Sequence, residues 1–172
     1  MIEWHEEPIA ARHDRMSFDC GVEELNTYLR QFARQNHERG GARTFVAVPA
    51  EYPTHVLGYY TFSATSLEFD QVPPNLQRGM GRYPVLMFLL ARLAVDRSMQ
   101  GHRLGHALVL KAGEKALALA PTIGGAGMLA DAIDETAAHW YQRFGARPLP
   151  TQPLSLVISF RHLREAIHSA DQ

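Results

Sequence analysis

The sequence predicts an α/β protein with a mixed sheet. Stretches that alternate or are rich in β-branched and aromatic residues, as strands are, lie between stretches whose apolar residues recur every three to four positions, as in helices. The chain has 172 residues, of which 46% are hydrophobic and 20% charged. This length and composition suit one globular domain with a sizeable core.

The N-terminal third predicts one helix followed by a β-hairpin. From Ser17 onward, apolar residues at helical spacing form an inner face, namely Val22, Leu25, Leu29, Phe32 and Ala33, and Gly40 and Gly41 end the helix. The segments "RTFVAV" (residues 43–48) and "HVLGYYTFSATSLEF" (55–69) read as strands. Because Pro53 marks a turn between them, we expect an antiparallel pair.

The middle of the chain predicts a buried strand that leads into a helix. Residues 70–83 contain prolines and glycines and read as a loop with short helical turns. "PVLMFLLARLAVD" (84–96) has no polar face, so we expect a strand buried on both faces. A helix over residues 103–119, closed by Pro121, follows with its inner face on Leu104, Ala107, Leu108, Ala112, Ala116 and Leu119.

The last third alternates strand and helix. Residues 123–131 predict a glycine-rich strand, residues 134–145 a short helix that Asp134 caps and Gly145 ends, and residues 154–160 a final strand. The tail after about residue 164 is expected to be disordered. In this order only the middle forms a parallel β-α-β unit.

Composition excludes several classes of protein. Residues 1–15 lack a basic region followed by an apolar one, so no secretory signal is expected, and the longest apolar run is too short to span a bilayer. We therefore expect a cytoplasmic protein without a membrane partner. The single cysteine, Cys20, excludes an internal disulfide and reads as a structural residue.

The charges argue in two directions about nucleic acid. The net charge of −1 and the isoelectric point near 6.8 argue against a strongly basic surface. All basic residues except Lys111 and Lys115 are arginines, and guanidinium groups suit phosphate. A GC-rich genome would explain the same bias.

The stretch "VDRSMQGHRLGHAL" (95–108) predicts an anion site at the start of a helix. The first amides of a helix lack partners, and the helix dipole adds positive character there. Gly101 and Gly105 allow close approach, and His102, Arg103 and His106 add donors. The pattern is neither a P-loop nor a dinucleotide fingerprint. The two histidines have zinc-ligand spacing, but no third ligand is evident, so no metal is expected.

Tyr141 is the second candidate. It shares a helix face with Ala137, Ala138 and Phe144, so it is either a packing residue at the edge of the core or a phenol that donates a proton to a leaving thiolate.

Taken together, "LARLAVDRSMQGHRLGHAL" and "AAHWYQRFGARPL" resemble the GNAT superfamily of N-acetyltransferases. Its acyl-CoA motif is Gln or Arg, two residues, Gly, one residue, then Gly or Ala, and it falls on residues 100–105, with Arg103 in place of the first glycine. We expect this position to be helical, so that it needs no positive φ. Arg103 could weaken binding by crowding the turn or strengthen it by contacting a phosphate.

Within the superfamily the chain is most similar to the bacterial toxins that acetylate aminoacyl-tRNA. The segments that carry this likeness are "FDCGVEELNTYLRQFARQNHERGGARTFVAV", "VLGYYTFSA", "RLAVDRSMQG" and "WYQRFGA". The resemblance implies a mostly antiparallel sheet with a central splayed parallel strand pair and flanking helices.

The resemblance also implies a mechanism. Acetyl-CoA would be the co-substrate, with its pantetheine paired to main-chain groups of Leu93, Ala94 and Val95. Tyr141 would protonate the departing sulfur, and no general base is evident. The pyrophosphate would be held by Gln100, Gly101, His102, Arg103, Leu104, Gly105 and His106. Arginines would line the acceptor cleft, namely Arg43, Arg82, Arg92 and Arg97.

The partners implied are aminoacyl-tRNA as substrate, a ribbon-helix-helix antitoxin and a second copy in a homodimer. Two alternatives stay open. The acceptor could be a polyamine, antibiotic, other small amine or protein terminus, which the near-neutral isoelectric point favours. The domain could also bind acyl-CoA as a regulator without turnover, which only Arg103 favours.

Overall fold

The strands form a seven-stranded mixed sheet in the order β1-β2-β3-β4-β5-β7-β6, in a computed structural model that describes residues 2–172. β4 and β5 are a parallel pair, and the other pairs with a known register are antiparallel. This confirms the predicted fold class. The chain forms two compact units, one of residues up to Ser63 with Arg92–Val109, the other of Ala64–Ala91 with Leu110–Gln172.

The first unit is built on an antiparallel meander. β1 (Trp4–Pro8) pairs with β2 (Arg43–Pro49), which pairs with the first half of β3 (Gly58–Leu67). The hairpin of β2 and β3 confirms the prediction. β1 was not expected, because its sequence, "WHEEP", is mostly polar and lacks the apolar alternation that predicts a strand.

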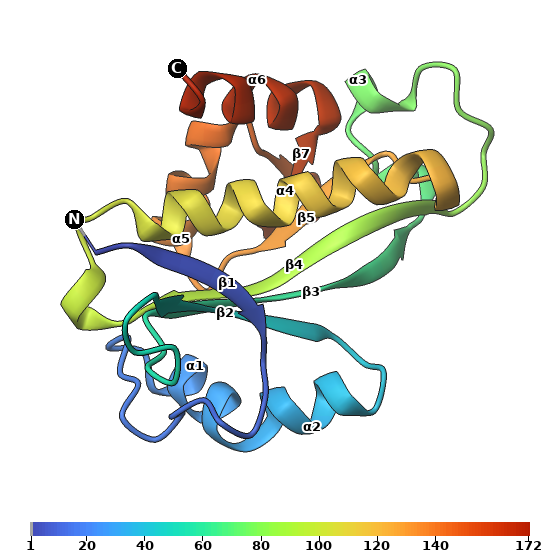
Figure 1. Cartoon of the computed structure of the whole chain (residues 1–172). Helices are drawn as coiled ribbons and strands as arrows, with labels where there is room; N and C mark the ends of the chain where they lie inside the picture. Colours follow the sequence, from blue (N-terminus) through green and yellow to red (C-terminus); the bar gives the residue numbers. More distant parts are fainter. Residues whose placement is uncertain (1) are drawn as a thin grey trace. The chain divides into compact units, whose positions relative to one another are not determined.

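The predicted N-terminal helix is interrupted by a π-helical turn. α1 (Glu23–Thr27) runs into η1 (Tyr28–Phe32) and then α2 (Ala33–Glu38), and α1 and α2 lie on one face of the meander (Figure 1). A π turn adds a residue to the helical repeat and rotates the following side chains. Leu29 is fully buried as predicted, but Phe32 is 49% exposed, and the prediction that it faces the core is wrong.

The end of β4 (Val85–Val95) and the start of α4 (Leu104–Ile123) also belong to the first unit. A short 3₁₀ turn, η3 (Arg97–Met99), joins them. α4 approaches the meander at Gly58, where an added Cβ would lie 3.1 Å from the side chain of Leu108 and 3.3 Å from that of Leu104. The first turns of α4 therefore pack where β3 has no side chain.

The second unit contains the parallel pair. β5 (Gly127–Asp131) pairs with β4 in the register Phe88↔Met128, and on its other side with β7 (Gln152–Ser159), which pairs with β6 (Arg147–Leu149). The predicted strand is confirmed, but its burial is only partial, because Met87, Phe88, Leu90 and Ala94 are buried and the other residues of β4 are intermediate.

α4 extends further than its sequence predicts. It continues through Pro121 to Ile123, so β5 starts at Gly127 rather than at residue 123. A proline in the last turn of a helix removes only one terminal hydrogen bond. Leu119 is 40% exposed, and its assignment to the inner face is wrong, whereas Leu104, Leu108, Ala112 and Ala116 are buried there.

The remaining helices flank the sheet. η2 (Phe69–Gln71) and α3 (Pro74–Gln77) are the short turns expected before β4. α5 (Glu135–Tyr141) continues into η4 (Gln142–Phe144), and the Asp134 side chain accepts from the Ala137 amide as predicted. Gly145, at φ 79°, ends this segment, which also confirms the prediction.

The C-terminal segment is a helix, α6 (Phe160–Ala170), not the disordered tail that the sequence suggested after about residue 164. Ser159 caps it by accepting from the His162 amide at 3.1 Å. Leu163 is fully buried, and an added Cβ on Gly113 of α4 would lie 3.0 Å from its side chain. Packing against α4 therefore orders a segment with little hydrophobicity of its own. Of residues 2–172, no helix is long and apolar enough to cross a membrane.

Candidate active site

The segment from the end of β4 to the start of α4 forms the turn for which the sequence predicts anion binding. Gly101 has a φ of 82°, and an added Cβ there would meet nothing within 4 Å, so the turn is open on this side. The first hydrogen bond of α4 joins the Ala107 amide to the Arg103 carbonyl at 3.1 Å. The amides of Leu104 and Gly105 therefore precede the helical ladder and are available to an anion.

Arg103 does not have the helical conformation expected for it. Its φ is 64°, and it is the only residue other than glycine with a positive φ in residues 2–172. It precedes the first residue of α4, so the turn of the helix does not set its backbone angles. In this left-handed region a Cβ costs ~1 kcal/mol. Glycine adopts this conformation without that cost, whereas this chain adopts it with an arginine.

Strand alternation separates the three residues expected to bind pantetheine. The Asp96 amide donates to the Leu57 carbonyl at 2.9 Å, and the carbonyl oxygen of Ala94 lies 3.0 Å from where a Cβ on Gly58 would be, so Ala94 faces β3. Main-chain groups of alternate residues point to opposite edges of a strand. The main-chain groups of Leu93 and Val95 therefore point to the edge of β4 that faces away from β3. This favours Leu93 and Val95, rather than Ala94, for pairing with pantetheine.

Tyr141, in the second unit, ends α5 with its ring 3% exposed. Burial raises the pKa of its hydroxyl well above the usual 10, and the Asp131 carboxylate raises it further. The Trp140 ring packs edge-on against the Tyr141 ring with centroids 5.1 Å apart. The phenol is therefore protonated at neutral pH.

The four arginines expected at the acceptor cleft have different surroundings. The Arg92 guanidinium lies 3.7 Å from the centroid of the Tyr28 ring, and the Arg97 Nε is 3.4 Å from an Asp19 carboxylate oxygen. Arg43 donates to the His37 carbonyl at 2.9 Å, and Arg82 is exposed in the second unit. Arg43, Arg92 and Arg97 lie in the first unit, but each guanidinium contacts a different residue.

His102 and His106 have a spacing that suits metal ligands. The His102 ring nitrogen Nδ1 is 3.1 Å from the Gln100 carbonyl, and no group of three or more potential ligands occurs in residues 2–172.

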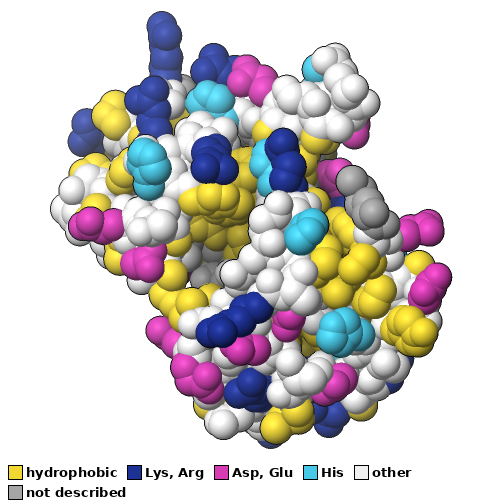
Figure 2. Space-filling model, turned by 90° about the vertical axis from the view of Figure 1, so that its left-hand side faces the viewer, with side chains coloured by type: hydrophobic (Ala, Val, Ile, Leu, Met, Phe, Trp, Pro, Cys, Tyr) yellow, Lys and Arg dark blue, Asp and Glu magenta, His cyan; other side chains and the backbone are white. Residues whose placement is uncertain are grey.

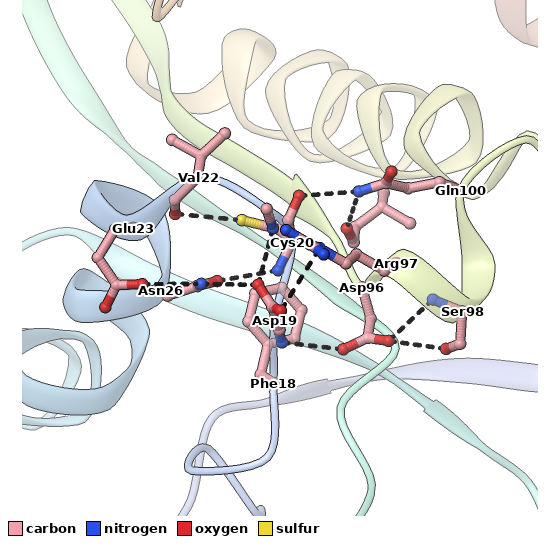
Figure 3. A network of polar contacts seen from close by, with 12 residues as sticks. Phe18, Asp19, Cys20, Val22, Glu23, Asn26, Asp96, Arg97, Ser98 and Gln100 are labelled. Carbon is pink, nitrogen blue, oxygen red and sulfur yellow. Dashed lines mark hydrogen bonds and ion pairs between the residues drawn. The ribbon is translucent and has the colours of Figure 1, made fainter.

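Sequence reasoning missed Asp19 and Asp96, which join the N-terminal loop to the turn, and Asn26, which bonds to the loop from α1 (Figure 3). Asp19 lies in "FDCG" and Asp96 in "RLAVDRSMQG", but neither segment reveals that the two residues meet.

No family model matches the chain. A tRNA-acetylating toxin of Mycobacterium tuberculosis is 35% identical over 159 residues, which cover 92% of this chain and 93% of the relative. The chain belongs to the tRNA-acetylating toxins. It is therefore an acetyltransferase, and the prediction from the GNAT-like segments is confirmed.

Solved structures agree with membership of the tRNA-acetylating toxins. AtaT complexed with acetyl-methionyl-tRNAfMet is 26% identical, covers 95% of this chain and 98% of that chain, and has a TM-score of 0.88. A mutant AtaT toxin bound to the C-terminus of the antitoxin AtaR and to acetyl-CoA is 25% identical, covers 94% and 96%, and has a TM-score of 0.81. The fold of this chain is thus that of enzymes solved with the cofactor predicted for it.

Proposed function

We propose that this toxin transfers the acetyl group of acetyl-CoA to the α-amine of an aminoacyl-tRNA and so blocks translation. The observation that carries the proposal is the 35% identity to a tRNA-acetylating toxin over nearly the full length of both chains. The complex of AtaT with acetyl-methionyl-tRNA supports the acceptor, and its complex with acetyl-CoA supports the donor.

Residues at the end of β4 and the start of α4 would hold acetyl-CoA. Leu93 and the Val95 amide offer main-chain groups to pantetheine, as an added strand would, while the Val95 carbonyl already accepts from the Gln100 side chain at 3.0 Å. The amides of Leu104 and Gly105, at the positive end of a 20-residue helix, suit the pyrophosphate. The exposed side chains of His102 and Arg103 lie beside this site and add donors.

In the reaction, the neutral amine attacks the thioester carbonyl, a C–N bond forms and the C–S bond breaks. Tyr141 donates its proton to the departing sulfur, and the proton that the amine loses passes to water. An α-amine has a pKa of roughly 8, so about a tenth of it is neutral at pH 7 and can react without a dedicated base. Because burial raises the Tyr141 pKa, the phenol keeps its proton at the near-neutral pH at which part of the amine is already neutral.

The acceptor would be bound by individual arginines rather than by a uniformly basic surface. Basic and acidic side chains are interspersed over the face shown in Figure 2, as the net charge of −1 suggests. Arg92, near the end of β4, and Arg97, in the turn η3 that follows it, lie on either side of the proposed pantetheine edge in sequence and are the arginines best placed to contact an acceptor phosphate.

Acetylation of charged tRNA tests the proposal. The purified protein is incubated with acetyl-CoA and a panel of aminoacyl-tRNAs, and N-acetylated amino acid at the 3′ end is measured. We expect product with at least one tRNA. Tyr141→Phe should lose at least a hundredfold in rate while acetyl-CoA affinity stays within twofold of wild type, since it removes only the proton donor. Tyr52→Phe, at an exposed tyrosine of the first unit, is the control.

Two other outcomes correspond to the alternatives. Acetylation of free amines or protein termini, with no product on any charged tRNA, would replace the acceptor. Acetyl-CoA binding without turnover on any amine would make the protein a regulator, and Tyr141→Phe would then have no rate to lose.

We also propose a ribbon-helix-helix antitoxin, a homodimer and a cytoplasmic location. The AtaT complex with the C-terminus of its antitoxin supports a protein antitoxin for this chain. Co-expression with the product of a small adjacent gene should relieve the growth arrest that the toxin causes alone, and sedimentation of the purified toxin measures its oligomeric state.

A further inference from the structure

In the N-terminal loop, the backbone of residues 19–21 ("DCG") is extensively hydrogen-bonded. Each amide and carbonyl from the Asp19 amide to the Gly21 amide has a partner. The Asp19 amide donates to the Asp96 carboxylate at 3.0 Å, and the Asp19 carbonyl accepts from the Arg97 amide at 2.9 Å. The Cys20 carbonyl accepts from the Gln100 side chain at 2.9 Å. Three of these bonds thus come from residues 96–100, which lead into the proposed cofactor turn (Figure 3).

The other two bonds brace the loop from within. The Cys20 amide donates to the Asn26 side-chain oxygen, and the Gly21 amide donates to an Asp19 carboxylate oxygen, both at 2.9 Å. The Asn26 nitrogen donates to the same Asp19 oxygen at 3.0 Å, and Asn26 is only 2% exposed. A buried amide with both ends bonded fixes the conformation of the loop.

Asp96 and Gln100 are the contacts on the side of the turn. Asp96 accepts from the Ser98 amide at 3.0 Å and the Ser98 hydroxyl at 2.7 Å, in addition to Asp19. Burial raises the pKa of Asp96, but these hydrogen bonds outweigh it and keep the pKa below its usual value. Gln100 donates to the Val95 carbonyl at 3.0 Å as well as to Cys20, so it joins the pantetheine edge to the loop.

We propose that the loop of residues 19–21 positions the acetyl-CoA turn, with Asp96 and Gln100 as positioning residues that do not themselves touch the cofactor through their side chains. The inference rests on the proposed function, in that the turn binds acetyl-CoA. It assigns a role to the "FDCG" segment, in which Gly21 has a φ of 87° and an added Cβ would lie 3.3 Å from the Arg97 Nε.

Affinity for acetyl-CoA, measured by calorimetry without any acceptor, tests the proposal on the side of the turn. Gln100→Met keeps the shape of the side chain and removes both donated hydrogen bonds, and Asp96→Asn removes the charge. We expect the Kd for acetyl-CoA to rise about tenfold in each, and kcat at saturating acetyl-CoA to stay within twofold. Asp14→Asn is the control, because Asp14 caps a turn in the same unit by accepting from the Met16 and Ser17 amides.

A glycine pair tests the side of the loop. Gly21→Ala and Gly40→Ala place the same left-handed strain in the same unit, but an added Cβ at Gly40 meets nothing within 4 Å. Both should lower Tm by similar amounts, and only Gly21→Ala should raise the Kd for acetyl-CoA. Equal Kd values in the two variants would overturn the proposal, since then the loop would contribute stability alone.

Hydrogen exchange of the free protein separates this proposal from the proposed function. Amides of residues 100–106 should exchange at least fivefold faster in Gln100→Met than in wild type, and amides of β7 at the wild-type rate. Unchanged exchange in the turn overturns positioning, whatever the enzyme acetylates. Faster exchange with no acetyl-CoA binding by the wild type would instead overturn the cofactor role of the turn.

Discussion

Arg103 combines two properties that oppose each other. Its backbone has the left-handed conformation that glycine adopts without cost, and its exposed guanidinium stands at the start of α4, where an anion is expected. A strained residue that persists in a proposed binding turn suggests that its side chain compensates for the strain through the ligand.

Replacement of Arg103 should separate stability from affinity. We expect Arg103→Gly to stabilise the free protein by about 1 kcal/mol, because it removes the Cβ penalty, and so to raise Tm by roughly 2–4 °C. Arg103→Ala keeps the Cβ and should leave Tm close to that of wild type. Both should weaken acetyl-CoA binding equally, because both lack the guanidinium. A Gly variant no more stable than the Ala variant in thermal unfolding would show that the backbone is not strained.

At the scale of elements, the π turn η1 decides which side chains of the N-terminal helix enter the core. Tyr28 is buried and stacks on Tyr59 with ring centroids 6.4 Å apart, while Arg92 lies over the same Tyr28 ring. A continuous α-helix would place Phe32 on the inner face with Leu29. The extra residue turns Phe32 outward instead, where it stacks on Tyr28 with ring centroids 6.4 Å apart.

Two alanine substitutions test the π turn. Leu29→Ala should cost 2–5 kcal/mol of unfolding free energy, as roughly expected for a fully buried leucine. Phe32→Ala should cost less than about 1 kcal/mol, although phenylalanine is the larger side chain, because half of it is in solvent. Denaturant titration measures both, and a larger loss for Phe32→Ala would contradict the π-helical register.

Elements with a strong local pattern were predictable, and elements fixed by tertiary contacts were not. β4 has an unbroken apolar run, and α5 has an N-cap at Asp134 and a glycine at its end, so both were located from sequence. β1 and β6 are short strands whose pairing depends on β2 and β7. α6 is ordered by one buried leucine and a cap, which local composition does not reveal.

In the candidate site, too, features with a local sequence signal were predictable and features that depend on contacts between distant residues were not. The turn before α4 could be located because glycines at a helix start are a local signal, and Tyr141 because its segment resembles a known family. The hydrogen-bond network that holds the turn could not be located from sequence. Asp19 and Asp96 are 77 positions apart, and Cys20 and Gln100 are 80 positions apart. A single sequence does not show which distant polar residues will meet.

Three elements also run from one compact unit into the other, namely β3, β4 and α4. Neither unit is continuous in sequence. If one unit unfolded alone, β3, β4 and α4 would each be broken in the middle, with the loss of hydrogen bonds on both sides of the boundary. We therefore expect the chain to unfold as one cooperative domain.

The two tryptophans allow this expectation to be measured, because Trp4 lies in β1 of the first unit and Trp140 in α5 of the second. In guanidinium titrations, Trp140→Phe reports the first unit and Trp4→Phe the second, and circular dichroism of each variant corrects for the substitution itself. We expect the fluorescence midpoint to coincide with the circular dichroism midpoint in both variants. Acetyl-CoA at a hundredfold excess over its Kd should stabilise both probes by about 2.7 kcal/mol. A midpoint that moves with acetyl-CoA in one variant alone would show that the units unfold separately and that the cofactor is held by only one of them.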